Sequence, residues 1–498
     1  MDSKLMELYA ALGYRAPRAS RLGHPVAPEQ SLPAMGPDGP QADAVEAEAD
    51  ELPPLGPDAL ESLRARFLRE PEDVLRQARE SLGASVSEMD FVRVLQEVEH
   101  ALREPEEALQ ALRRPAVGAK ASVLLPPDFR FPLMTREIPI DPSRTKFEPV
   151  ADLRGWLLFS GRAWLRGAMV RRAPFRRHDG ASHPSRFRYA LREPASGRPV
   201  EVAVFSDFGT GEYPARYVAR QLAMRGERLG YAVHLGGVYY AGRQGEFDAH
   251  VAEPLEPLLP ETTVLTLSSS AELRSGGTPY FRYLDERRGA ARARQVQEGS
   301  YFCLASERFQ LIGLDTAYFE PGRYREPALL GWLESVLAEG RRRGAVNLLM
   351  SHGAPYRYGA TRASELLEDL RELVVERAQV DLWLWGSTPY GALFDRGPGL
   401  PFLGASLGHG GLPVARAGPG AASPAPVRFL ESRPRFPEWT GVRPELGNNG
   451  YGSLLLHDDG AVGLQFLDWM GNVRCTARLA REAGQGPLVI QRLESAGE

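Results

Sequence analysis

The sequence predicts an α/β sandwich, in which strands and helices alternate along the chain. From residue 200 onward, short apolar runs of strand length alternate with longer amphipathic segments, a pattern typical of strands connected by helices. Near the C-terminal end, two strand-like runs are separated by Asp459-Gly460, a dipeptide favoured in tight hairpin turns, which indicates antiparallel strands there. The chain has 498 residues, 43% of them hydrophobic and 25% charged, enough for one large domain and a smaller one.

The expected elements of the main domain follow from this alternation. Pro214 stands near the start of the first expected helix, where proline suits the first helical position. The helices are expected at 214–229, 327–341 and 363–377. The strands are expected at 200–206, 231–235, 263–267, 309–314, 346–350, 380–385, 402–406, 452–457 and 463–468.

Residues 1–57 are predicted to form a disordered, proline-rich and acidic N-terminal arm. Residues 16–57 contain nine prolines and an acidic patch between Asp43 and Glu51. Such a segment buries too little apolar surface to offset the entropy that ordering would cost. A short apolar stretch at residues 5–14 is either a docking helix or a frayed tail.

Residues 58–115 are predicted to be a helical segment. Ser87 is placed to cap a helix with an apolar face, while Arg and Glu dominate the other face. This pattern favours a small helical bundle or docking arm, and the alternative is a helix that binds a partner. The apolar positions at helical spacing are Phe91, Leu95, Val98 and Leu102.

Residues 116–199 are predicted to be an extended linker that ends in a basic, aromatic lead-in to the main domain. The stretch 154–177 contains seven arginines with tryptophan and phenylalanine residues between them. Two interpretations remain open. The aromatic rings pack on the main domain while the arginine stems extend over its edge, or the stretch binds nucleic acid or an anionic membrane surface.

Several loops follow predicted strands and carry polar or glycine-rich sequence. In α/β folds, the loops after the carboxyl ends of the strands carry the chemistry. We therefore expect these loops to converge on one cleft. They are residues 207–211, 236–240, 268–277, 351–355 and 386–389.

The order and context of these loops resemble the calcineurin-like metallophosphoesterases, nearest to the branch with the purple acid phosphatase pattern. That branch carries GDxG, GDxxY, GNH(D/E), a later single His and GHxH in this order. The resemblance covers roughly residues 200–470 and leaves out the first 150 residues. It implies a four-layer α/β sandwich over residues 200–480, which leaves 481–498 as a C-terminal tail.

Most of the metal-ligand positions that the resemblance implies carry other residues. Asp207, Tyr240 and His352 stand where the family keeps the first Asp, the Tyr of GDxxY and the single His. The replaced positions are Gly237 for the bridging Asp, Ser270 for the Asn, Ala271 for the His that meets the phosphoester, and Ser387 and Pro389 for the two His of GHxH.

These replacements would remove the chemistry of the family. A two-metal phosphoesterase holds two cations about 4 Å apart, lowers the pKa of a bound water and stabilises both the attacking and the leaving oxygen. With Gly237 in place of a carboxylate, no side chain bridges the metals. We therefore expect no metal cofactor, and we interpret Asp207, Tyr240 and His352 as vestigial ligand positions.

Each of these polar residues also has a purely structural interpretation. Asp207 is placed to cap the turn that leads into the helix at Pro214. Tyr240 would be a partly buried tyrosine with a satisfied hydroxyl, and His352 a hydrogen-bonded histidine in the core or at its rim. His409 lies in a glycine-rich loop that could face the cleft.

Composition bounds the compartment and the partners. Two cysteines cannot build a disulfide framework, and neither a secretory signal nor a membrane span is evident. We therefore expect a cytoplasmic protein. The net charge of −4 gives no general reason to expect nucleic acid binding. A protein partner is expected to bind the N-terminal arm, and the oligomeric state is left open.

Three functions are compatible with the sequence. The leading one is a degenerate metallophosphoesterase-fold protein, a pseudo-phosphoesterase that binds a ligand or acts as a scaffold. The second is an active hydrolase with a rebuilt mononuclear site, in which Glu272 or His409 assists Asp207, Tyr240 and His352. The third is a protein that binds an anionic surface or nucleic acid through residues 154–177.

Overall fold

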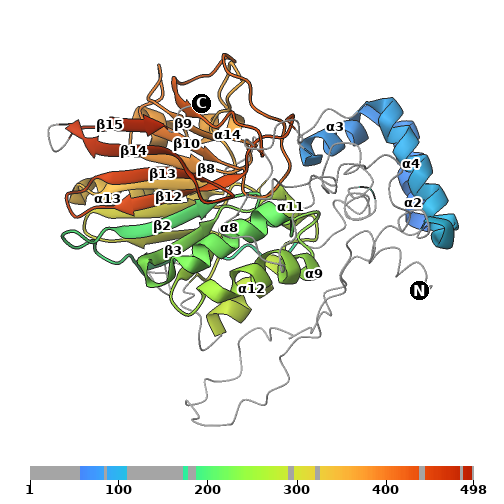
Figure 1. The fold of residues 1–498 in the computed structure, drawn as a ribbon, viewed down its shortest axis with the longest axis horizontal. Helices are drawn as coiled ribbons and strands as arrows, with labels where there is room; N and C mark the ends of the chain where they lie inside the picture. The colour runs from blue at the N-terminus through green and yellow to red at the C-terminus, as the bar shows by residue number, and fades with distance from the viewer. Residues whose placement is uncertain are drawn as a thin grey trace, which may run out of the picture.

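The computed structural model describes residues 57–82, 87–108, 157, 172–177, 187–289, 297–319, 326–436, 444–482 and 486–495. Two β-sheets lie face to face with helices outside them (Figure 1). The expectations for residues 1–56 and for most of 109–186 lie outside the described residues. Within the described part, no helix combines the length and the apolar character that crossing a membrane requires.

The eight-stranded sheet has a parallel centre. Strands β6, β7, β8 and β10 run parallel to one another. The pairs β5–β6, β9–β10 and β9–β11 are antiparallel. In spatial order the strands are β1 (Arg188–Ala190), β5 (Phe302–Ala305), β6 (Phe309–Leu314), β7 (Val346–Ser351), β8 (Leu382–Trp385), β10 (Leu403–Leu407), β9 (Gly391–Phe394) and β11 (Val427–Leu430).

The seven-stranded sheet joins a parallel half to an antiparallel half. Strands β2, β3 and β4 are parallel, and β12 to β15 form an antiparallel meander that joins them through β2. In spatial order the strands are β15 (Leu488–Ser495), β14 (Val473–Arg481), β13 (Val462–Asp468), β12 (Gly450–Leu456), β2 (Val200–Phe205), β3 (Leu229–His234) and β4 (Thr263–Thr266).

Helices cover the outer faces of both sheets. Helices α8, α9 and α12 lie over β2 and β3 (Figure 1), and α13 begins with a proline and ends at Gly344, whose φ of 71° is left-handed. The α-helices are α8 (Tyr213–Met224), α9 (Gln244–Phe247), α10 (Glu253–Leu255), α11 (Ser270–Leu273), α12 (Thr278–Gly289), α13 (Pro327–Arg343) and α14 (Glu365–Asp369). Shorter turns are η2 (Gly226–Arg228), η3 (Asp248–Ala252), η4 (Glu256–Leu258) and η5 (Glu372–Glu376).

Three apolar clusters separate four layers, which confirms the predicted sandwich. Because side chains alternate along a strand, β8 directs Leu382 and Leu384 into the cluster between the sheets. The same strand directs Trp383 and Trp385 into the cluster beneath α13 and α14. A third cluster lies between the seven-stranded sheet and α8, α9 and α12. Both faces of the central strands are therefore buried.

The N-terminal helical segment has its own small core. Helices α2 (Pro57–Arg69), α3 (Pro71–Leu82) and α4 (Glu88–Arg103) form a separate group (Figure 1). Phe67 of α2 stacks on Phe91 of α4 with ring centroids 4.6 Å apart. Phe91 and Val98 are fully buried, as their helical spacing predicts.

Part of the basic lead-in packs on the sandwich. Phe175 lies against Tyr301 and Tyr318, with ring centroids 5.6 and 4.8 Å away. Arg176 donates two hydrogen bonds of 2.7 Å to the carboxylate of Asp285. Residues 172–177 are therefore part of the main domain, while 158–171 lie outside the described residues.

Three of the expected boundaries are wrong. Residues 488–495 do not belong to a tail, because β15 pairs with β14 along its length and buries Leu488. Residues 363–377 do not form one α-helix, because the segment is divided into α14 and the π-helical turn η5. The first expected helix also ends early, at Met224, because Gly226 adopts a left-handed φ of 52° and Leu229 already belongs to β3.

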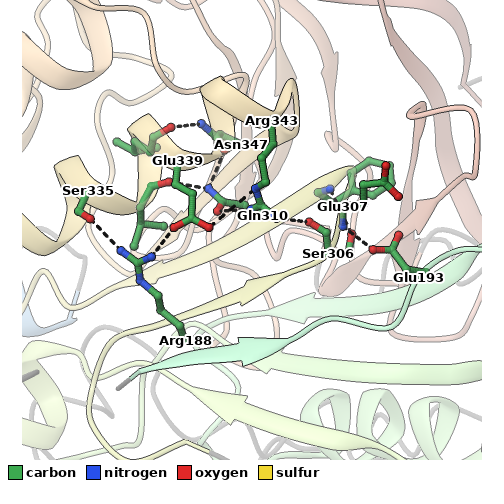
Figure 2. A network of polar contacts seen from close by, with 12 residues as sticks. Arg188, Glu193, Ser306, Glu307, Gln310, Ser335, Glu339, Arg343 and Asn347 are labelled. Carbon is green, nitrogen blue, oxygen red and sulfur yellow. Dashed lines mark hydrogen bonds and ion pairs between the residues drawn. The ribbon is translucent and has the colours of Figure 1, made fainter. Parts of the chain in front are cut away.

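A buried polar network attaches α13 to the eight-stranded sheet (Figure 2). Gln310 on β6 donates to the Asn347 amide oxygen on β7 at 3.0 Å and accepts from Arg343 on α13 at 2.8 Å. The Asn347 amide also donates to the Leu337 carbonyl of the helix at 3.1 Å. Gly340 faces this network, and a Cβ there would lie 2.1 Å from the Asn347 Oδ1.

We expect Gly340→Ala to destabilise the protein by about 1–3 kcal/mol, because its methyl group would displace the Gln310–Asn347 hydrogen bond. The matched control is Gly331→Ala in the same helix, where no atom lies within 4 Å of the added Cβ. That control should instead gain about 0.5–1 kcal/mol of helix propensity. Urea unfolding of both variants measures the effect, and equal changes in the two would contradict the assignment.

Candidate functional site

The five loops that the sequence predicts to converge meet at one edge of the sandwich, and we call them the strand-end loops: residues 207–211, 236–240, 268–277, 351–355 and 386–389. The Asp207 N–H donates to the Gly236 carbonyl, joining the loops after β2 and β3 at 2.9 Å. The Gly386 N–H donates to the Ser351 carbonyl at 3.0 Å, joining the regions after β8 and β7. The two sheets also approach each other here: the Ser206 hydroxyl, after β2, lies 3.5 Å from the His352 Nδ1, after β7.

Asp207 is buried and bound by neighbouring loops. Its backbone adopts a φ of 52°, and its Oδ1 accepts a hydrogen bond of 2.5 Å from the Tyr239 hydroxyl. Burial raises the pKa of the carboxyl to about 7, although hydrogen bonds from Tyr239 and the Ser387 backbone act in the opposite direction. The Tyr239 phenol thus covers one oxygen of a buried carboxyl.

Tyr239 supplies a phenol that contacts Asp207, and Tyr240, at the tyrosine position of the resemblance, contacts neighbouring residues through its backbone. Burial and the neighbouring Asp207 charge raise the pKa of Tyr239 well above its usual range, so its hydroxyl remains a donor. The Tyr240 backbone N–H donates to the Glu246 Oε1 at 2.8 Å, and its carbonyl accepts from Arg274 at 3.0 Å.

Gly237 lies directly against Asp207. Its φ is 101°, which is a left-handed conformation that disfavours residues with a side chain. A Cβ at Gly237 would lie 2.6 Å from the Asp207 Oδ1 and 2.8 Å from the Asp207 Cα. A side chain at Gly237 would therefore collide with Asp207, and restoring an Asp here requires the loop to move.

Glu272 joins the loops after β3 and β4. It is fully buried, and it accepts hydrogen bonds from the Gly237 N–H at 2.9 Å and the Ser269 N–H at 3.1 Å. Burial raises the pKa of its carboxyl, and the Ser269 hydroxyl bond opposes that shift. Because both carboxylate oxygens accept bonds from the loops, Glu272 acts here as a structural acceptor.

The replaced positions of the third motif belong to a helix start. Ser269 caps α11, and its hydroxyl accepts from the Ala271 N–H at 3.1 Å. Together with Glu272 it forms a capping box, which satisfies backbone donors of the first turn. Ser270 is exposed and Ala271 is buried, so neither offers a ligand to the strand-end loops.

His352 is half-buried and hydrogen-bonded to the loop after β3. Its Nδ1 lies 3.0 Å from the Leu235 carbonyl, and burial lowers the pKa of the ring. In the last motif, Ser387 has a φ of 50° and Pro389 is exposed. His409 is buried, with its ring against Gly391 and Gly450, and burial lowers its pKa to about 4.

Among the described residues, no three His, Cys, Asp or Glu ligand atoms converge at this edge. Within the described part of the chain, one group of His, Cys, Asp or Glu ligand atoms lies within 4.8 Å of one another, and it is the exposed set His100, Glu104 and Glu107 on and after α4. Asp207 and His352 belong to no such group among those residues. Dinuclear sites need several oxygen and nitrogen ligands converging on both cations.

Sequence reasoning missed the roles of Tyr239 and Glu272. A signal for Glu272 was present, because Ser269-Ser270-Ala271-Glu272 fits the capping-box pattern. No local pattern distinguishes Tyr239 from Tyr240, since the choice depends on how the loop after β3 lies against Asp207.

Neither a family model nor a curated protein sequence matches the chain. Among solved structures, it is similar to the purple acid phosphatase PPD1 from yellow lupin seeds, with 17% identity and a TM-score of 0.45 over 60% of this chain and 56% of that one. It is also similar to GAP50, the anchor in the inner membrane complex of Plasmodium, with 15% identity and a TM-score of 0.42. That match covers 59% of this chain and 89% of GAP50.

A dimetal phosphatase from Danio rerio gives 12% identity and a TM-score of 0.37, over 56% of this chain and 98% of that one. The chain spans little more than half the length of the lupin phosphatase.

We expect Gly237→Ala to cost about 2–5 kcal/mol, because it adds a collision with the Asp207 backbone to the strain of a positive φ. Gly344→Ala is the control, since Gly344 has a φ of 71° but no atom within 4 Å of its added Cβ. It should cost only about 1–2 kcal/mol. Denaturant unfolding compares them, and equal costs would refute a close contact at Gly237.

We expect Asp207→Asn to change how stability depends on pH. Because burial raises the Asp207 pKa from 3.8 to about 7, the native state favours the protonated carboxyl. That contribution is complete below about pH 4 and is lost as the pH rises through 7. Wild type should therefore weaken relative to Asp207→Asn between pH 4 and 7, by on the order of 3 kcal/mol.

Denaturant unfolding of both proteins at several pH values provides the measurement. Asp458→Asn, in the hairpin turn after β12, controls for removing a carboxylate outside the strand-end loops. A free-energy difference between wild type and Asp207→Asn that stays constant from pH 4 to 8 would show that the native carboxyl titrates normally.

Proposed function

We propose that this protein is a catalytically inactive member of the metallophosphoesterase fold that acts by binding rather than by hydrolysis. Support for the fold comes from the order of the loop motifs on a four-layer sandwich with two sheets. Support for inactivity comes from the contacts between the loops after β2, β3 and β4, which involve Asp207, Gly237 and Glu272. The observation that carries the proposal is the approach of Gly237 to Asp207, which leaves no room for a bridging side chain at Gly237 unless the loop moves.

The contacts around Asp207 fit a structural role for this region. Tyr239 covers the carboxyl, Glu272 binds the Gly237 N–H, and His352 binds the Leu235 carbonyl. Each of these three side chains thus holds one loop against another. Hydrolysis through two metals would need these groups to exchange loop contacts for ligand bonds, and it would still lack a bridge between the cations.

A binding or scaffold role is supported by the helical segment. Among the exposed large apolar side chains in the described residues, Leu68, Met89 and Val92 lie on α2 and α4, with exposed fractions of 74%, 83% and 36%. Exposed apolar side chains of this size favour a contact with another protein. We propose that a protein partner binds through this segment and the N-terminal arm before it, and that the protein works in the cytoplasm.

The test is a metal analysis of the purified protein after incubation with iron, zinc or manganese, together with phosphoesterase assays. We expect less than one tightly bound metal per chain and no turnover above that of buffer. Two metals per chain with turnover would contradict the proposal.

The mononuclear alternative has its own test. If Asp207 and His352 hold a single catalytic metal, the protein should bind one metal per chain, and His352→Ala should abolish turnover while Tyr240→Phe weakens it. Metal content that is unchanged in His352→Ala would exclude that site.

A further inference from the structure

A second polar site lies beside the strand-end loops and is built around Arg435. This side chain follows β11 and is only 1% exposed. Its Nη1 lies 3.5 Å from the Tyr213 hydroxyl and its Nη2 lies 3.5 Å from the Leu412 carbonyl, while its Nε has no hydrogen-bond partner. Both bonds are at the long limit, so they are weak.

Arg435 differs from the other deeply buried arginines. Arg474 faces the Glu431 carboxylate at 3.0 Å, and Arg243 faces Glu246 at 2.8 Å. Across the described segments, no carboxylate lies within ion-pair distance of Arg435. The Tyr213 ring centroid is 6.0 Å away, at the outer limit of a cation–π contact. A buried guanidinium without a counter-charge costs several kcal/mol, so this position favours an anion.

Two buried asparagines complete the site. Asn449 donates to the Leu412 carbonyl at 2.7 Å, so its amide and the Arg435 guanidinium converge on the same oxygen. The Asn449 amide oxygen has no hydrogen-bond partner, and neither amide atom of Asn448 has one. Asn448 and Asn449 are 2% and 0% exposed. Buried amides without partners are uncommon in folded proteins, so these atoms are available to a ligand or to a water.

The backbone explains why these groups lie together. The Arg435 N–H donates to the Leu446 carbonyl at 2.8 Å, and the Asn448 N–H donates to the Arg433 carbonyl at 3.1 Å. In this antiparallel pairing, the side chains of Arg435 and Asn448 lie on the same face of the two paired segments. Leu412 also links the two sites, because its N–H donates to the Asp207 carbonyl at 3.2 Å.

We propose that Arg435, Asn448 and Asn449 form a buried binding site for one small oxyanion, such as a carboxylate, bicarbonate or phosphate. The Arg435 Nε–H and the Asn448 amide supply donors for the anionic oxygens. The amide oxygens of the two asparagines would accept from a hydroxyl of a protonated oxyanion or from a water that binds with it. The planar guanidinium matches a planar oxyanion edge better than it matches chloride. This site is separate from the strand-end loops and does not depend on their being inactive.

The test is the thermal unfolding midpoint of the full-length protein in chloride, and in formate, bicarbonate or inorganic phosphate at the same ionic strength. A ligand that binds only the native state raises the midpoint saturably with its concentration. We expect at least one of the three oxyanions to raise the wild-type midpoint by several degrees over chloride. Isothermal titration of wild type with that oxyanion should give one site per chain.

Arg435→Met identifies the residue that binds the ion. Methionine removes the buried charge at similar length, so in chloride the variant should be at least as stable as wild type, and the oxyanion should no longer raise its midpoint. The matched control is Arg474→Met, which leaves the buried Glu431 carboxylate without its arginine partner. It should be less stable in every salt and still respond to the oxyanion.

Three outcomes would overturn the proposal. The first is a wild-type midpoint that is the same in all four salts, with no heat of binding. The second is an oxyanion response in Arg435→Met equal to that of wild type. The third is a response that survives in Arg435→Met but disappears in His352→Ala, which would assign the oxyanion to the strand-end loops. Because the titration uses wild type, the proposal stays testable even if a variant fails to fold.

Discussion

The edge of the sandwich depends on one close backbone approach, that of Gly237 to Asp207. The loop after β3 passes so near the loop after β2 that a single added methyl group would lie 2.8 Å from the Asp207 Cα. Both residues adopt a positive φ, and Tyr239 and Glu272 hold the two loops in place. Tyr239, Glu272 and His352 thus serve as contacts between loops.

This arrangement separates the fold from the chemistry. The sheets bring the carboxyl ends of β2, β3, β7 and β8 together because both of their inner faces are apolar and must be buried against each other. The packing requires nothing of the residues beyond those strand ends. Loops can thus exchange ligands for glycine and serine without loss of the core. Burial then shifts the remaining titratable groups toward their neutral forms, as the pKa values of Asp207 and His352 show.

Much of the main domain could be predicted, and the errors have identifiable causes. All nine expected strands form, and most of their residues are buried. Six further strands were not expected. The edge strands β1, β11 and β15 carry partly exposed polar residues, β14 alternates buried and partly exposed residues, and β5 and β9 are runs of only four residues. The division of the expected helix over 363–377 was not predicted, because no local sequence pattern indicates the π-helical turn η5.

The sequence by itself determined the layered α/β architecture and the set of loops at its edge, because apolar periodicity and strand order are written locally along the chain. Only the tertiary structure decided which side chains fill that edge. Tyr239 rather than Tyr240 contacts Asp207, Glu272 binds a backbone N–H, and Arg435 is buried without a carboxylate. Those outcomes depend on contacts between segments far apart in sequence, where distance and burial set the energy of each polar group.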